Sequence, residues 1–314
     1  LLFSGGDGSR VKVPTVLQME TTGCGTRGVY FNSPAEPGHM VSMNRDTTHH
    51  HIENVIERGW KFYAERTWAA GLFYWTGFYY RGEPNPLQYS AHESEFGILD
   101  YCGFPKDEAY YLKSWWTDEP VLHLLPHWNL QGHEGEEVEI WAYSNCDEVE
   151  LTVNGKKLGR QTMPCNGHLK WTATYQPGKM VAVGYKDGKR VITQTVETTK
   201  PAAGADRTSI KADGRDVAIV TIEVKDTKGR TVPDACPLLT FRLNGNGRII
   251  GAGNGNPSYL GADHPQDKDC TTFQIPAFNG LAQVLIQSTH TAGALQLTCT
   301  ADGLKEHTIT LNAE

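Results

Sequence analysis

The fold is decided by the stretch Val16-Leu17-Gln18-Met19-Glu20-Thr21-Thr22-Gly23, an apolar run that ends on a carboxylate and then enters a loop of small residues. Pro14 precedes it, and residues 15–19 have the pattern of a buried parallel strand. A carboxylate at the C-terminal end of such a strand faces the mouth of a barrel, where catalytic groups lie. Because strands often end on a solvated Glu, Glu20 alone is compatible with a solvated or a catalytic role.

A second apolar stretch, residues 71–84, predicts another buried strand that ends at Trp75. An indole there offers a flat face to the C–H groups of a sugar, with its N–H free to bond. A core position is the alternative, and the place of Trp75 at a strand end favours the substrate role. Between the two stretches, residues 49–66 carry apolar side chains at near-helical spacing. They predict an amphipathic helix packed on the outside of the barrel.

Three ordered motifs carry a family resemblance: METTG at 19–23 with RGVY at 27–30, WTGF at 75–78 with RGEP at 81–84, and FGILD at 96–100 with GFPKD at 103–107. Together they resemble the end of the catalytic barrel in β-galactosidase-like members of glycoside hydrolase family 2. The resemblance implies strands seven and eight of a TIM barrel. It also implies that Glu20 attacks the anomeric carbon in a retaining mechanism, with the acid/base Glu supplied by strand four, upstream of this sequence.

The resemblance further implies substrate-binding roles for Trp75, Tyr79, Arg27 and Glu83, and a cis peptide bond between Trp75 and Thr76. Many relatives carry an acidic residue where this chain has Tyr79. A phenol has a different reach from a carboxylate, so the exact sugar stays open. Near Arg81 and Glu83, a sugar clamp and a loop ion pair are both compatible with the pattern, and the long loop of residues 21–46 suits a lid or a plain surface loop.

After Trp116 the pattern changes to short alternating strands separated by turns, with hairpin signals at Asn154-Gly155 and Asp187-Gly188. The spacing fits a β-sandwich of immunoglobulin size, and a one-sidedly apolar strand at residues 217–225 begins another after a linker. We therefore expect a multidomain chain. Residues 1–117 form the C-terminal part of a (β/α)8 TIM barrel, with a helix at 107–116 that buries Trp115 and Trp116; residues 118–200 and 201–314 form two all-β immunoglobulin-like sandwiches.

Composition excludes some classes of partner. The 314 residues carry a formal net charge of -7, which disfavours nucleic acid because phosphate is bound mainly by Lys and Arg. No apolar run is long enough for a membrane span. A periplasmic or extracellular location is implied by the resemblance alone.

No metal or cofactor is expected. The triplet His49-His50-His51 points in different directions on a helix, which favours a surface role over a metal site. Residues 251–257 have few carboxylates, which favours a turn over a calcium site. The seven cysteines show no C-x-x-C spacing, and Cys24, beside Glu20, lacks a local base for thiol catalysis.

The sequence thus predicts a retaining glycoside hydrolase that cleaves terminal β-galactosides in an oligosaccharide or polysaccharide through a covalent glycosyl-enzyme intermediate. The alternatives are a β-glucuronidase or other β-glycosidase of the same family, and a non-catalytic carbohydrate-binding or adhesin-like fragment. Since two parallel strands cannot close a barrel, we also expect residues 1–117 to pack against a missing N-terminal part of the same enzyme.

Overall fold

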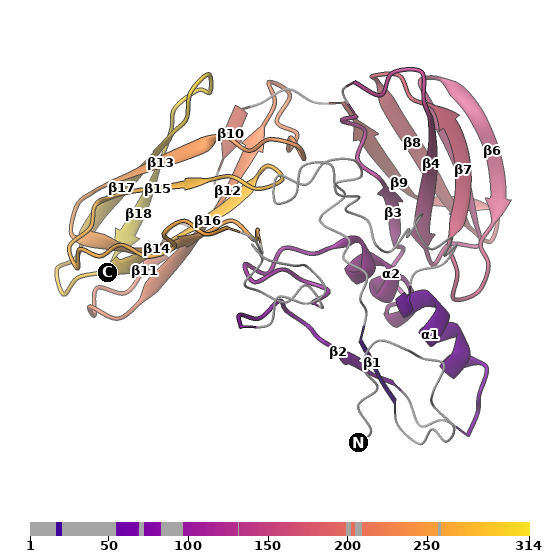
Figure 1. Ribbon diagram of the computed structural model, residues 1–314, viewed down its shortest axis with the longest axis horizontal. Helices are drawn as coiled ribbons and strands as arrows, with labels where there is room; N and C mark the ends of the chain where they lie inside the picture. The colour runs from indigo at the N-terminus through magenta and orange to yellow at the C-terminus, as the bar shows by residue number, and fades with distance from the viewer. Residues whose placement is uncertain are drawn as a thin grey trace. The chain divides into compact units, whose positions relative to one another are not determined.

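The computed structural model describes residues 17–20, 55–68, 72–82, 97–130, 132–198, 202–204, 209–256 and 259–314. The chain divides into two compact units, Leu1–Thr198 and Thr199–Glu314, and each is described here by itself (Figure 1). Both units are built mainly of antiparallel sheets. Among the described residues, no helix is both long and apolar enough to cross a membrane.

The first unit begins with a two-stranded parallel sheet. Its strands are β1 (Leu17–Glu20) and β2 (Leu72–Trp75), and the helix α1 (Val55–Ala64) lies between them in sequence. The helix α2 (Asp107–Trp116) follows, with the bounds that the sequence predicts. The assignment of β1 and β2 to strands seven and eight of a TIM barrel stays a prediction.

Two sheets then share one core in the first unit. The strands are β3 (Leu122–Leu125), β4 (Glu137–Ser144) and β7 (Leu169–Thr174) in one sheet, and β6 (Lys156–Thr162), β5 (Glu148–Val153), β8 (Lys179–Lys186) and β9 (Lys189–Glu197) in the other. Trp128, Ile140 and Leu151 are fully buried in this core. Positive φ angles at Asn154 and Asp187, each followed by a positive-φ Gly, confirm the two predicted hairpins.

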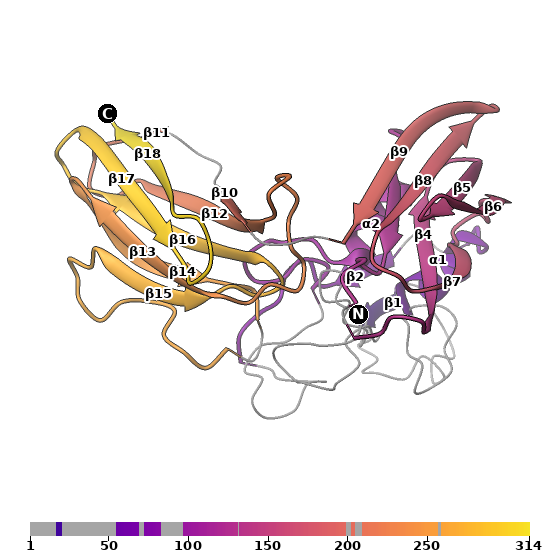
Figure 2. The ribbon, with the colours of Figure 1, turned by 90° about the horizontal axis from the view of Figure 1, so that it is seen from above.

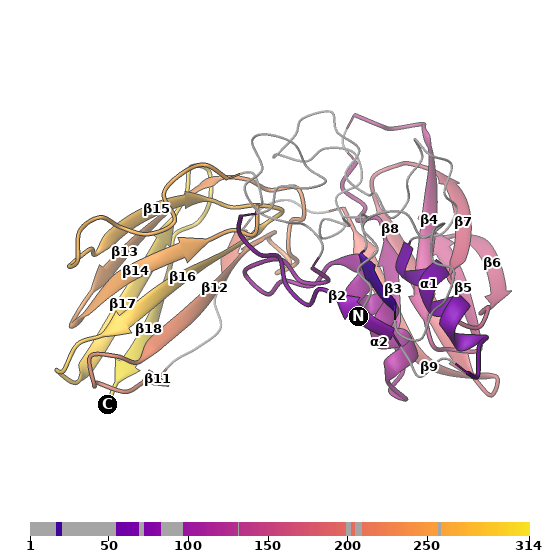
Figure 3. The same ribbon diagram turned by 60° about the horizontal axis from the view of Figure 1, so that its bottom comes forward.

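The strand β4 is covered on both faces. Ile140 and Ala142 point into the core between the two sheets, whereas Trp141 and Tyr143 pack against Tyr111 of α2. Because successive side chains of a strand point to opposite faces, these two pairs lie on opposite sides of the sheet. Figures 1 and 3 show α1 and α2 beside this sheet.

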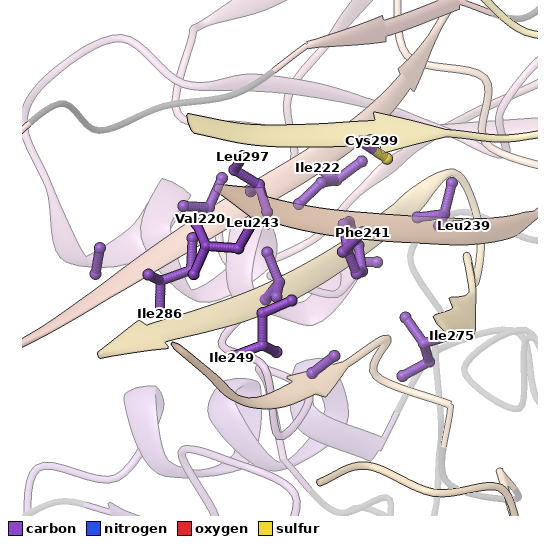
Figure 4. Close-up of a cluster of buried hydrophobic side chains, with 14 of the residues drawn as sticks. Val220, Ile222, Leu239, Phe241, Leu243, Ile249, Ile275, Ile286, Leu297 and Cys299 are labelled. Carbon is purple, nitrogen blue, oxygen red and sulfur yellow. The ribbon is translucent and has the colours of Figure 1, made fainter. Parts of the chain in front are cut away.

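The second unit also packs two sheets around its own core, and its strands run alongside one another in Figure 2. One sheet contains β10 (Ala202–Gly204), β12 (Val217–Lys225), β16 (Leu281–Ser288) and β14 (Gly247–Gly253). The other contains β11 (Ser209–Ile210), β18 (His307–Ala313), β17 (Gly293–Thr300), β13 (Leu238–Asn244) and β15 (Thr272–Pro276). Figure 4 shows Val220, Phe241 and Ile286 among the converging core side chains.

The alternation predicted for residues 217–225 is confirmed, since Ala218, Val220, Ile222 and Val224 are buried. The prediction of a buried Trp116 is wrong: its side chain is 56% exposed at the end of α2, 5.8 Å from the ring of Trp60. Among the described residues, a cis peptide bond is recorded between Leu125 and Pro126. The predicted cis bond between Trp75 and Thr76 is not recorded. The domain bounds 1–117, 118–200 and 201–314, and the immunoglobulin-like assignment, stay predictions.

Candidate active site

The two residues at the centre of the predicted site are neighbours in the backbone. Glu20 is the register partner of Trp75, and each is the last residue of its strand. Because β1 and β2 are parallel, their carboxyl ends lie at one edge of the sheet, with backbones about 4.8 Å apart. The topology therefore gathers a carboxylate residue and an indole residue at the edge where parallel sheets carry their catalytic groups.

Two loops that follow β2 are paired with each other. Residues 76–81 and 97–106, called the paired loops below, are joined by backbone hydrogen bonds: Tyr79 N donates to Leu99 O at 3.0 Å, and Leu99 N donates to Gly77 O at 2.9 Å. Position 97 requires glycine, because the Cβ of any other residue would collide with the backbone of Phe78, Tyr79 and Leu99. This close packing fixes the chain that leaves the predicted catalytic edge.

Asp100 holds the second of the paired loops. Its Oδ1 accepts hydrogen bonds from the backbone N–H groups of Cys102 at 2.9 Å and Phe104 at 3.0 Å. The side chain is 2% exposed, and its own N–H donates to the carbonyl of Phe104. This is the arrangement in which an aspartate stabilises a tight turn through its own backbone.

Tyr79 is buried between the paired loops. It is 5% exposed, and the ammonium of Lys106, itself 1% exposed, lies 4.8 Å from the centroid of its ring. Such a distance gives a favourable contact between a cation and an aromatic face. Contact between Tyr79 and a sugar stays a prediction. Tyr79 lies four residues after the end of β2, and its ring contacts the buried ammonium of Lys106.

Lys106, Asp100 and Phe78 were not predicted as candidate site residues from the sequence. Phe78 is 55% exposed on the paired loops, and nearby the guanidinium of Arg81 lies 5.8 Å from the ring centroid of Tyr101. All of these residues lie within or next to the second and third motifs.

Several predicted features lie outside the described residues, namely Arg27, Glu83, Cys24, the loop of residues 21–46 and the triplet His49-His50-His51. No group of three or more metal-ligating side chains occurs in the part of the chain that the structure describes. Because the histidine triplet lies outside that part, the expectation that no metal is bound stays a prediction. At the glycine-rich run, Asn254 donates to the carbonyl of Pro276 and accepts from Asn256 N, which is a turn geometry.

Comparison with known families identifies the class. Residues 202–310 match the model described as glycoside hydrolase family 2 C-terminal domain 5, and residues 135–192 match a domain of unknown function, DUF4982. The chain belongs to glycoside hydrolase family 2, as the three motifs indicated.

Curated relatives and solved structures agree with this family. A beta-galactosidase of Bacteroides ovatus, BoGH2A, is 40% identical over 83% of this chain, and a putative beta-glucuronidase of Formosa agariphila is 34% identical over 63% of it. The chain spans 30% and 20% of those relatives. The crystal structure of a beta-glycosidase from Bacteroides vulgatus aligns with a TM-score of 0.79 and 28% identity, covering 95% of this chain and 42% of that one.

Proposed function

We propose that this chain is part of a retaining β-glycosidase that cleaves terminal β-galactosides, with Glu20 as the nucleophile. The observation that carries the proposal is the parallel register that pairs Glu20 with Trp75 at the ends of β1 and β2. In the same proposal, β1 and β2 are the last two strands of a TIM barrel and the sheets that follow form two immunoglobulin-like sandwiches. The protein acts in the periplasm or outside the cell, on an oligosaccharide or polysaccharide.

The chemistry follows from two carboxyl groups about 5 to 5.5 Å apart. The Glu20 carboxylate attacks the anomeric carbon while a second Glu, supplied by upstream sequence, protonates the leaving oxygen. A water molecule, deprotonated by that second Glu, then attacks the same carbon and releases Glu20. Trp75 offers an apolar face for the sugar ring, which orients the anomeric carbon without competing for its hydroxyl groups.

The substrate class has two candidates. A β-galactosidase is favoured because a relative of that name is 40% identical over most of the chain. A β-glucuronidase is supported by the relative at 34% identity. A glucuronide carries a carboxylate, which a protein binds best with a cationic side chain. Arg27 and Lys106 are the candidate cations for that role. A purely carbohydrate-binding role is less well supported, because a binding module has no use for a strand-end carboxylate.

The test uses the full-length protein with chromogenic β-D-galactosides and β-D-glucuronides. Glu20→Ala is expected to lose turnover by several orders of magnitude and to regain it with azide, a small anion that enters the vacated space and gives the α-glycosyl azide. Glu65→Ala is the matched control, since the Glu65 side chain is 73% exposed. Full activity in Glu20→Ala would disprove the nucleophile, and the ratio of the two wild-type kcat/KM values decides the substrate.

A further inference from the structure

Two histidine–carboxylate pairs join the helices to the sheet β3-β4-β7. Glu57 of α1 places Oε2 2.6 Å from Nδ1 of His168, and both side chains are almost fully buried, at 1% and 5% exposure. Asp107 of α2 places Oδ1 2.7 Å from Nε2 of His123 in β3. In each pair the ring nitrogen donates to a carboxylate, so α1 is bonded to the residue just before β7 and α2 is bonded to β3.

Aromatic rings fix the orientation of both histidines. The ring of His168 stacks on Trp141 with centroids 3.8 Å apart, and the ring of His123 stacks on Tyr110 with centroids 3.9 Å apart. Stacking fixes the plane of each imidazole ring, and the bond to the carboxylate then selects which ring nitrogen faces it. Lys61, one turn along α1, places Nζ 2.8 Å from the other oxygen of Glu57, so the position of this carboxylate is set from two sides.

A single residue links both helices to the loop before β7. The side-chain oxygen of Asn166 accepts from Trp60 Nε1 at 3.0 Å, and its carbonyl accepts from the hydroxyl of Tyr111 at 2.8 Å. Asn166 has φ 54, a left-handed conformation that Asn tolerates better than most residues. Residues 163–168, called the docking loop below, thus present Asn166 and His168 to α1 and the carbonyl of Asn166 to α2.

Buried polar pairs often add little to stability, because desolvation offsets most of their attraction. These pairs nevertheless set a short distance between each helix and its partner histidine. Seven residues, 65–71, separate the end of α1 from the start of β2 in the sequence. We propose that the docking loop is a positioning element that sets α1, and through it β2 and Trp75, relative to Glu20. Its consequence for catalysis rests on the proposed function; the placement of α1 and β2 does not.

The experiment compares variants of the full-length protein. His168→Phe keeps a ring on Trp141 and removes the bond to Glu57, His168→Asn keeps a donor nitrogen near the Nδ1 position, and Asn166→Ala removes the bond to Trp60. The matched control is His133→Phe, because His133 pairs with Glu136 at 3.0 Å in an exposed loop of the same unit. The measurements are amide hydrogen exchange of residues 55–82 and the separate values of kcat and KM.

We expect exchange in α1 and β2 to accelerate about tenfold or more in His168→Phe, the effect of losing a hydrogen bond to a buried charged group. His168→Asn is expected to recover part of the protection, Asn166→Ala to fall between, and His133→Phe to match wild type. We also expect kcat/KM to fall by about tenfold in His168→Phe, mainly through kcat, because Glu20 and Trp75 meet the transition state less well.

Two results would overturn the inference: faster exchange confined to the docking loop with α1 and β2 unchanged, or unchanged kcat/KM in His168→Phe despite a loosened α1. If wild type turns over no β-glycoside, the proposed function fails, and the exchange of residues 55–82 still decides whether the docking loop positions α1 and β2. Should His168→Phe fail to fold, His168→Asn and Asn166→Ala, which remove less, make the same comparison.

Discussion

At the scale of single residues, Asp100 is a charged side chain that is buried and stabilises a turn. We expect Asp100→Ala to lower the free energy of unfolding by about 1–3 kcal/mol, because it leaves the N–H groups of Cys102 and Phe104 without their acceptor. Asp100→Asn keeps an acceptor oxygen and is expected to cost less. Urea denaturation followed by Trp fluorescence measures both variants, and equal losses would show that the accepted bonds are not what matters.

Tyr79 is buried, and it is also a residue that we predict to contact the sugar. Tyr79→Asp would set a carboxylate near the ammonium of Lys106, in place of the ring that now lies 4.8 Å from it. We expect a changed ratio of kcat/KM between a β-galactoside and its C4 epimer, since the position lies on a loop that leaves β2. Tyr79→Phe, which keeps the ring, is the control. An unchanged ratio in Tyr79→Asp would show that this position does not read the sugar.

The cysteines differ in reactivity because they differ in burial. Burial raises the pKa of the Cys299 thiol to about 11, whereas Cys165 is exposed. The thiolate is the reactive form, so at pH 8 only about one Cys299 thiol in a thousand is reactive. We expect iodoacetamide to label Cys165 well before Cys299, and labelling of Cys299 to accelerate about tenfold per pH unit below that pKa. Peptide mass spectrometry across pH 7 to 9 checks this; equal rates would contradict it.

At the scale of elements, local signals predicted local structure well. The Asn-Gly and Asp-Gly hairpins and the bounds of α2 depend on a few adjacent residues, and the structure confirms them. The exposure of Trp116 and the burial of Glu57 depend instead on which face of a helix meets a sheet. The partner of Glu57 is His168, which lies far along the chain. The helical pattern around Glu57 therefore does not predict that its side chain is buried.

The paired loops give an element-scale prediction with its own control. Gly97→Ala adds a Cβ that collides with the backbone of Phe78 and Leu99, so the loops must separate; Gly77→Ala meets nothing within 4 Å. We expect Gly97→Ala to lower the melting temperature and kcat/KM markedly, and Gly77→Ala to change both little. Equal behaviour of the two variants in thermal melting would mean that the loops tolerate separation.

At the scale of the whole molecule, the second unit has a core of its own. Every buried residue of the cluster around Val220 and Phe241 belongs to residues 210–313. We expect residues 199–314, produced alone, to unfold cooperatively in urea with native-like circular dichroism, because this core needs no side chain from the first unit. A broad, non-cooperative transition would contradict this.

The candidate site was predictable only in outline at this scale. The strand ends of β1 and β2 follow from apolar runs, and their pairing places Glu20 beside Trp75. The paired loops were not predictable, because Asp100 and Lys106 are polar residues whose burial depends on contacts with Tyr79 and the turn they close. Arg27 and Glu83, which lie outside the described residues, stay predictions from the motifs.

The bond between Glu57 and His168 also constrains how such genes can recombine. Its partners lie on either side of β2, the paired loops, α2 and the first strands of the sheet. A crossover anywhere between codons 57 and 168 would bring a carboxylate from one parent against the docking loop of another. Chimeras joined within that interval should therefore hold α1 in place only when residue 57 of one parent and residue 168 of the other form a compatible pair, and related sequences should show positions 57 and 168 changing together.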